Sequence, residues 1–245
     1  MTIATVNNLT IPPYKIISTQ DTEYPLNNSD TFTKNALNQL YYLGNLSLLR
    51  KSKIGFCGSR HASKKGLETA KDCAEQSAKR GIVVVSGYAS GVDLVAHTTS
   101  LTFGGSTILV LPEGIANFTI KKQLQNVWDW ERVLVISQFK PEDFWQPFRA
   151  FTRNKTIIAL SSVMVVIEAG DKGGTLHAGL ETLKANKKLF VAYYQDKTKS
   201  NEGNATLISQ GGVKLCKSRT TLKANLVDAF SYCNIISAGT SDLIS

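Results

Sequence analysis

Short apolar runs alternate with longer amphipathic segments through the middle of the chain. Several of the runs are near-continuous Val, Ile and Leu, which is typical of strands covered on both faces of a sheet. We expect strands over Ile54–Cys57, Ile82–Ser86, Thr107–Leu111, Val133–Ser137, Val163–Glu168 and Leu189–Tyr193.

The segments between these runs carry apolar residues at helical spacing. In the clearest case, Gly66–Arg80, small apolar residues recur every three or four positions and Gly81 follows as a stop signal. Further helices are expected over Val92–Leu101, Phe144–Leu160 and Thr175–Ala185. Strand and helix in alternation predict an α/β fold, a doubly wound and mostly parallel sheet with helices on both faces. Ligands of such sheets bind at the C-terminal ends of the strands.

The two ends of the chain have a different character from this core. Residues 1–50 hold Pro12, Pro13 and Pro25 and then an amphipathic patch from Leu37 to Leu49, so we expect an N-terminal extension that packs on the core. Residues 51–220 form the predicted core domain. Residues 221–245 are expected to form a helix over Leu222–Tyr232 and a loose tail.

Composition excludes several classes of protein. The chain has 245 residues, 42% of them hydrophobic, but no apolar run of about 18 residues, so no membrane span is expected. The start of the chain does not resemble a secretion signal, and the four cysteines lack CxxC spacing. We therefore expect a cytoplasmic protein with buried thiols and without a metal or cofactor.

The net charge of +9 is unevenly distributed. Residues 183–223 and 51–65 are rich in lysine and arginine, and the second stretch contains no acidic residue. Such clusters favour nucleic acid or another polyanion as partner, whereas a solvated lysine-rich surface is the plainer interpretation.

The first predicted strand ends in Gly58-Ser59-Arg60, directly before a predicted helix. A glycine at this turn allows close approach of a ligand, a helix start offers unpaired N–H groups, and an arginine fork suits two phosphate oxygens. This turn, with Ser63 a few residues later, predicts an anion site for a phosphate, either free or within a nucleotide or nucleic acid.

Other loops of small and polar residues occur at or beside later strand ends. Their candidate contacts are Ser86, Gly87, Gly91 and Asp93, then Arg153, Asn154 and Lys155, and finally Gly173, Gly174 and Thr175. Each loop alone has an architectural explanation: Asp93 as an N-cap, His97 as a packing residue, or Arg153 and Lys155 as surface charges. Because several such loops converge on one sheet edge, we expect a phosphate cradle.

Catalytic signatures are missing from these loops. Ser86, Asp93 and His97 supply the residue types of a hydrolase, but the chain contains no GxSxG, GxGxxG or GxxxxGK[ST] motif. Nothing in the sequence compels catalysis, and we do not expect an enzyme.

The ordered set of loops resembles the DNA-processing protein A (DprA/Smf) family. The resemblance includes Gly58-Ser59-Arg60, the stretch from Val85 to Asp93 with Ala96-His97, Arg153-Asn154-Lys155, Val166 to Leu176, and Gly203-Asn204 with Leu207-Ile208. It spans roughly Tyr24 to Gly212. The match departs from the family at Ser90, where members commonly have arginine, and we expect no C-terminal winged helix of the kind that many members carry.

The resemblance implies an extended Rossmann-like domain that protects single-stranded DNA and loads a RecA-type recombinase during DNA uptake. It also implies a homodimer that acts in natural transformation and catalyses no covalent reaction. In that case Arg60, Arg153 and Lys155 hold phosphates, and the amides of Ser59, Gly173 and Gly174 line the same pocket. Phe148 or Phe151 would stack on a base.

Two other functions fit the same pattern. The cradle could bind a nucleotide or nucleotide-derived signal as a sensor. It could also cleave nucleoside monophosphates at the glycosidic bond, as a family on a related fold does with a PGGxGTxxE loop. Only the glycine-threonine part of that loop is present here, and Glu181 lies too far from Thr175.

Overall fold

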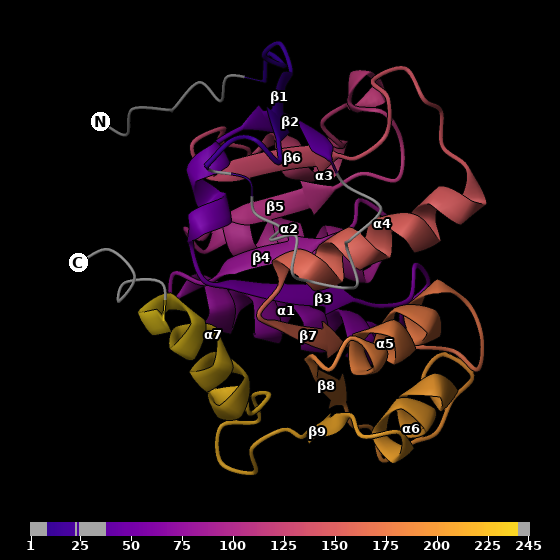
Figure 1. Cartoon of the computed structure of the whole chain (residues 1–245). Helices are drawn as coiled ribbons and strands as arrows, with labels where there is room; N and C mark the ends of the chain where they lie inside the picture. The colour runs from indigo at the N-terminus through magenta and orange to yellow at the C-terminus, as the bar shows by residue number, and fades with distance from the viewer. Residues whose placement is uncertain (1–8, 23, 25–37, 240–245) are drawn as a thin grey trace.

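A single mixed sheet organises the part of the chain that the computed structural model describes, residues 9–22, 24 and 38–239 (Figure 1). Its strands lie in the order β1-β2-β6-β5-β4-β3-β7-β8-β9. Their bounds are β1 Lys15–Ser18, β2 Gln39–Gly44, β3 Lys53–Cys57, β4 Val83–Ser86, β5 Thr107–Val110, β6 Val133–Ser137, β7 Val163–Val166, β8 Lys188–Ala192 and β9 Val213–Leu215.

The strands from β3 to β9 are parallel to one another. From β3 the chain winds outward through β4, β5 and β6 on one side, then returns to place β7, β8 and β9 on the other. The predicted doubly wound sheet is thus confirmed, and the switch in winding direction falls between β3 and β7. A crevice outside the carboxyl ends of these two strands is the expected ligand site of such a fold.

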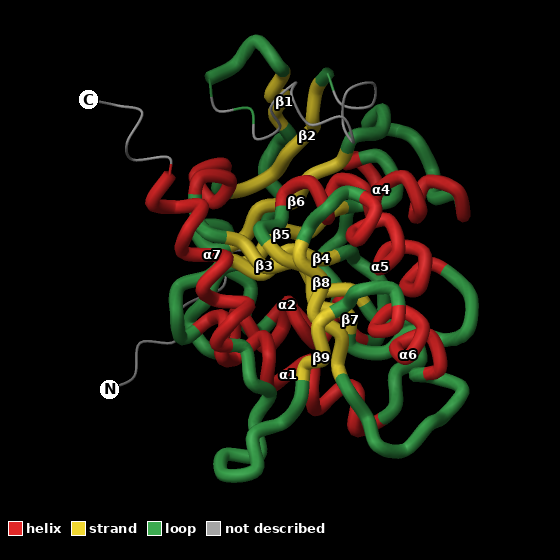
Figure 2. Tube along the Cα trace, turned by 60° about the horizontal axis from the view of Figure 1, so that its bottom comes forward, coloured by secondary structure: helices red, strands yellow, loops and turns green. Residues whose placement is uncertain are grey.

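Helices cover both faces of the sheet (Figure 2). They are α1 Lys64–Ala78, α2 Val92–Thr102, α3 Lys122–Gln125, α4 Pro147–Leu160, α5 Gly174–Lys184, α6 Glu202–Ser209 and α7 Val227–Gly239, with short 3-10 turns at Leu46–Arg50 and Ile115–Asn117. Apolar side chains of α4, α5 and α6 form one core with the sheet. Those of α1, α2 and α7 form a second core on the opposite face. No described helix combines the length and apolar character that crossing a membrane requires.

The described part of the N-terminal extension contributes two strands, β1 and β2, to the sheet itself. We expected an amphipathic patch packing on the core, whereas Gln39–Gly44 forms strand β2, antiparallel to both β6 and β1. The reason is the alternation along β2, in which Leu40 joins one core while Tyr41 and Leu43 join a core on the other face. Leu37 and Pro25 lie outside the described residues.

The C-terminal helix begins later than its apolar pattern suggests. It starts at Val227, five residues beyond the expected Leu222. Leu222 has φ of 57°, a left-handed conformation that cannot continue a helix, and a bridge between Lys217 and Ala224 closes the turn around it. Residues 240–245 of the predicted tail lie outside the description.

Candidate functional site

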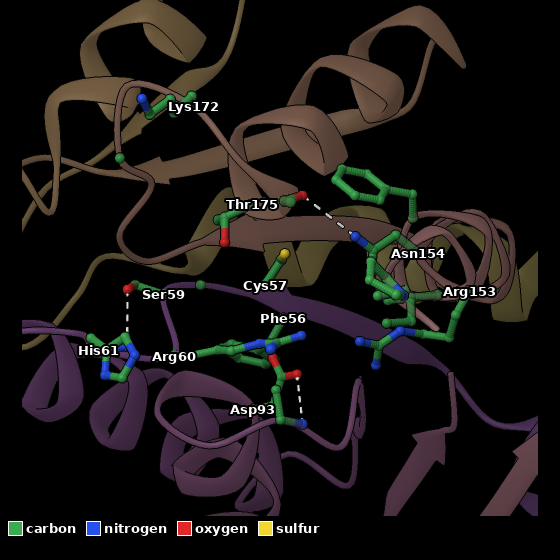
Figure 3. A pocket seen from close by; sticks show the side chains of 18 of the residues that line it. Phe56, Cys57, Ser59, Arg60, His61, Asp93, Arg153, Asn154, Lys172 and Thr175 are labelled. Atoms are coloured by element: carbon green, nitrogen blue, oxygen red, sulfur yellow. Dashed lines mark hydrogen bonds between the residues drawn. The ribbon is translucent and has the colours of Figure 1, made fainter. Parts of the chain in front are cut away.

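A hollow of about 590 Å³ opens at the carboxyl ends of β3 and β7 (Figure 3). We call it the switch-point hollow. Its walls come from the turn after β3, the start of α5 and one side of α4. Of the residues predicted from sequence, it is lined by Gly58, Ser59, Arg60, Asp93, Phe151, Arg153, Asn154, Gly174 and Thr175. The fold therefore brings residues of all four predicted loops to one place.

The other predicted residues do not line this hollow. They are Ser63, Ser86, Gly87, Gly91, Phe148, Lys155 and Gly173. Most of them hold the loops in shape. Ser86 is fully buried and donates to the Phe56 carbonyl and to Asp93. Gly91 has φ of 76°, which disfavours any residue with a side chain. A Cβ at this position would also collide with the Ser59 carbonyl. Lys155 lies exposed on α4, away from the hollow.

Gly58 and the start of α1 both have packing partners inside the fold. A Cβ on Gly58 would overlap the Val92 side chain, so this glycine allows α2 to approach β3. The start of α1 is already occupied by Glu168, which is 1% exposed. Its carboxylate accepts hydrogen bonds from the amide of Ser63 at 2.8 Å and from its hydroxyl at 2.5 Å. An internal carboxylate therefore lies at this helix end, and its negative charge disfavours a phosphate there.

The start of α5 offers what α1 does not. Its N-cap, Gly173, has φ of 103° and provides no side-chain cap, so the first amides of the helix are not capped from that position. Gly174 and Thr175 of this turn line the hollow, and the Asn154 side chain reaches the Gly174 carbonyl at 3.4 Å. The positive end of the α5 dipole thus faces the hollow and favours an anion.

Three exposed cations surround this helix start. Arg60 and Lys172 line the hollow (Figure 3), and Lys199 lines it as well. Among the described lining residues, Asp93 alone carries a carboxylate. That carboxylate is buried and accepts hydrogen bonds from the Ser86 hydroxyl and from the Ala89 amide. The field in the hollow is therefore positive. Lys172 and Lys199 were not among the predicted site residues, although the charged stretch after residue 183 pointed toward Lys199.

Arg153 is buried rather than a surface charge. Its side chain is 5% exposed, and its Nη1 donates to the Val110 carbonyl at 2.9 Å. Burial lowers the pKa of Arg153, and the nearby Asp93 carboxylate opposes that shift. Gly87 leaves the space that the guanidinium occupies, because a Cβ there would collide with Nη1. Arg153 contacts the hollow with only a small part of its surface.

Aromatic side chains border the same hollow. Phe151 is 40% exposed and meets His177 edge to face at 5.2 Å, while Phe148 is 62% exposed but does not line the hollow. Trp145, which sequence reasoning missed, is 43% exposed and lies 6.0 Å from the Arg60 guanidinium. A base entering the hollow therefore has Phe151 and Trp145 to stack on.

The residue types of a hydrolase do not form a nucleophile–base pair. Ser86 donates to Asp93, whereas the ring of His97 contacts the Gly87 carbonyl and the Thr107 hydroxyl, each at 2.6 Å. Cys57 lies at the floor of the hollow, and burial raises the pKa of its thiol to about 12, which disfavours a thiolate.

Comparison with known proteins identifies the family of this chain. The sequence model of the family described as DNA recombination-mediator protein A matches residues 15–226. The chain belongs to this family. The resemblance seen in the sequence motifs is thereby confirmed.

Members of this family from well-known bacteria are similar over much of the chain. The DNA processing protein DprA of Streptococcus pneumoniae is 32% identical over 182 residues, which cover 74% of this chain and 62% of that protein. DprA of Bacillus subtilis is 29% identical over 154 residues, covering 62% of this chain and 52% of that protein. The chain thus matches less than two thirds of the length of either relative.

Solved structures of the family share the fold. The crystal structure of S. pneumoniae DprA superposes with a TM-score of 0.73 at 28% identity, covering 82% of this chain and 71% of that one. DprA from Helicobacter pylori, described for its single-stranded DNA binding mode, superposes with a TM-score of 0.69 at 23% identity and covers 91% of this chain and 95% of that one. At that identity the second likeness shows the fold alone.

Proposed function

We propose that this chain binds single-stranded DNA in the switch-point hollow, with phosphates on the α5 amides and the surrounding cations and a base on the aromatic side chains. Binding involves no covalent reaction. The observation that carries the proposal is the convergence of an uncapped helix start with Arg60, Lys172 and Lys199 around one hollow. These groups bind a sugar-phosphate chain through its negative charge, and the exposed aromatic rings stack on any base.

Binding of a fluorescent oligo-dT of about 35 nucleotides, followed by anisotropy, tests the proposal. Arg60→Ala should weaken binding at low salt by about tenfold or more, because a hydrogen bond to a charged group contributes about 1.5–3 kcal/mol. The slope of log affinity against log salt should fall by about 0.7, the value for one phosphate of a single strand. The affinity of Arg60→Lys, which keeps the charge without the planar guanidinium, should fall between those of wild type and Arg60→Ala.

Lys51→Ala provides the matched control. Lys51 is exposed and precedes β3, whereas Arg60 follows it, so the two cations lie at opposite ends of the same strand. Both variants remove one positive charge, and only Arg60→Ala removes it from the hollow. Absence of binding at low salt, or equal effects of the two variants, would refute the proposal.

The same titrations distinguish the other functions that the sequence left open. A mononucleotide that displaces the oligonucleotide at low concentration would favour a nucleotide sensor. Release of a free base from a nucleoside monophosphate would favour the hydrolase. RecA-type recombinase loading, homodimer assembly and natural transformation stay predictions of the family resemblance, and a cytoplasmic location stays a prediction of the composition.

A further inference from the structure

A second, smaller hollow adjoins the first. Its volume is about 290 Å³, and it lies beyond Trp145 on the side of the β4 and β5 loops. Arg60, Ala89, Trp145 and Arg153 line both hollows, so the two spaces meet across the Arg60–Trp145 pair. We call the second space the Glu113 hollow, after the acidic side chain that distinguishes it.

The chemistry of the Glu113 hollow differs from that of its neighbour. Glu113 is half-buried, and within the described part of the chain its carboxylate makes no hydrogen bond or ion pair. Burial raises the pKa of Glu113, although Lys121 and Arg153 nearby lower it. Lys121 is held by its Nζ, which donates to the Tyr88 carbonyl at 2.5 Å. An acceptor and a donor thus face one small space without neutralising each other in an ion pair.

A buried donor without a partner lies at the junction of the two hollows. The Nε of Arg153 makes no hydrogen bond, although the residue is only 5% exposed. Unsatisfied buried donors are rare because each costs about 1–3 kcal/mol. The guanidinium that borders both hollows is thus under-satisfied.

We propose that the Glu113 hollow receives an unpaired base that carries an exocyclic amino group, with Glu113 as the acceptor, while the adjoining phosphates stay over the switch-point hollow. This inference rests on the proposed binding of single-stranded DNA. A carboxylate repels a phosphate but accepts a hydrogen bond from the N4 amino group of cytosine. A Lys121 N–H then remains for a ring carbonyl on the same base. The strand therefore crosses the Arg60–Trp145 pair with one base on the far side.

The sign of one substitution separates base recognition from simple charge. If only phosphates pass nearby, Glu113→Ala removes a repulsive charge and strengthens binding to every oligonucleotide. If the carboxylate accepts from an amino group, Glu113→Ala weakens binding to cytosine and leaves thymine, which has no amino group, nearly unchanged. Glu113→Gln keeps one acceptor oxygen and should retain part of the preference.

The experiment compares oligo-dC and oligo-dT of about 12 nucleotides, equal in charge and ring size, at about pH 8 by anisotropy. Wild type should prefer oligo-dC by about fivefold, the effect of one net hydrogen bond of about 1 kcal/mol. Glu113→Ala should abolish that preference. The control is Glu142→Ala, which removes an exposed acid outside both hollows and should leave the preference intact.

Three outcomes decide the matter. Loss of the oligo-dC preference in Glu113→Ala alone supports the inference. Equal binding of both oligonucleotides by wild type, or a uniform gain in Glu113→Ala, overturns it and leaves the proposed function standing. Failure of wild type to bind either oligonucleotide overturns both. Thermal unfolding of each variant confirms that the fold is intact before binding is compared.

Discussion

His97 makes the stability of the site loops depend on pH. The ring is fully buried, between the Gly87 carbonyl at Nε2 and the Thr107 hydroxyl at Nδ1. The carbonyl can only accept, so the neutral ring carries its proton on Nε2, and Nδ1 shares the Thr107 hydroxyl proton with the Val84 carbonyl, 2.9 Å from that hydroxyl. Burial is the largest influence on the pKa of His97 and lowers it from 6.5 to about 4. The Gly87 contact and the nearby Asp93 raise the pKa, but by less.

The magnitude follows from this lowered pKa. The unfolded chain binds a proton near pH 6.5 and the folded chain only near pH 4, so the unfolded state binds more protons between these values. Stability contributed by the neutral ring is complete above pH 6.5 and is lost as pH falls toward 4. At 1.36 kcal/mol per pKa unit the loss is about 2 kcal/mol at pH 5 and about 3 kcal/mol below pH 4.

Urea unfolding at about pH 7.5 and pH 5 measures this loss. His97→Asn lowers stability at both values because it leaves a cavity, but its change between them should be smaller than that of wild type by about 2 kcal/mol. His61 and His177 are exposed and present in both proteins, so their contributions cancel. Most carboxylates titrate below this range.

A direct titration provides the refuting result. The Cε1 proton of His97, followed by NMR, should keep its neutral shift down to about pH 5. A transition at or above pH 6.5 would mean that both ring nitrogens donate, with the Thr107 hydroxyl turned to the Val84 carbonyl, 2.9 Å away. Acid would then stabilise the fold relative to His97→Asn, opposite to the expectation.

Two further predictions concern groups that shape the site. Glu168→Gln should lower the free energy of unfolding by about 2–4 kcal/mol in urea, because it weakens two charge-assisted hydrogen bonds from Ser63 at the start of α1; a loss below about 1 kcal/mol would contradict the capping role. Gly87→Ala should destabilise by about 3 kcal/mol or prevent folding, because the new Cβ meets the Arg153 guanidinium. Gly174→Ala, with open space around its Cβ, should change stability by less than about 1 kcal/mol, and equal melting temperatures of the two variants would refute the argument.

The order of strands and helices from β3 to β8 was predictable from the sequence apart from the short helix α3, whereas α6 and β9 were not predicted. Apolar runs such as Val83–Ser86 and Val163–Val166 report burial on both faces, and each is followed by a helix with its own apolar spacing. Strand β2 was missed because its alternation is short and lies among residues that also suit a helix. Helix α7 was placed too early because no sequence signal marks the left-handed Leu222.

The sequence by itself determined that loops of small and polar residues follow neighbouring parallel strands. Because the carboxyl ends of parallel strands point the same way, this is enough to bring Arg60 and Thr175 to the same edge of the sheet. Only the tertiary structure decided which polar groups remain available there. Glu168 is taken up by α1 and Arg153 by the loop around Gly87, whereas α5 stays uncapped. The hydrogen-bond partners and the burial of these side chains depend on contacts between residues far apart in the chain, so local periodicity does not predict them. For the same reason Trp145 and Lys199 join the site only in three dimensions.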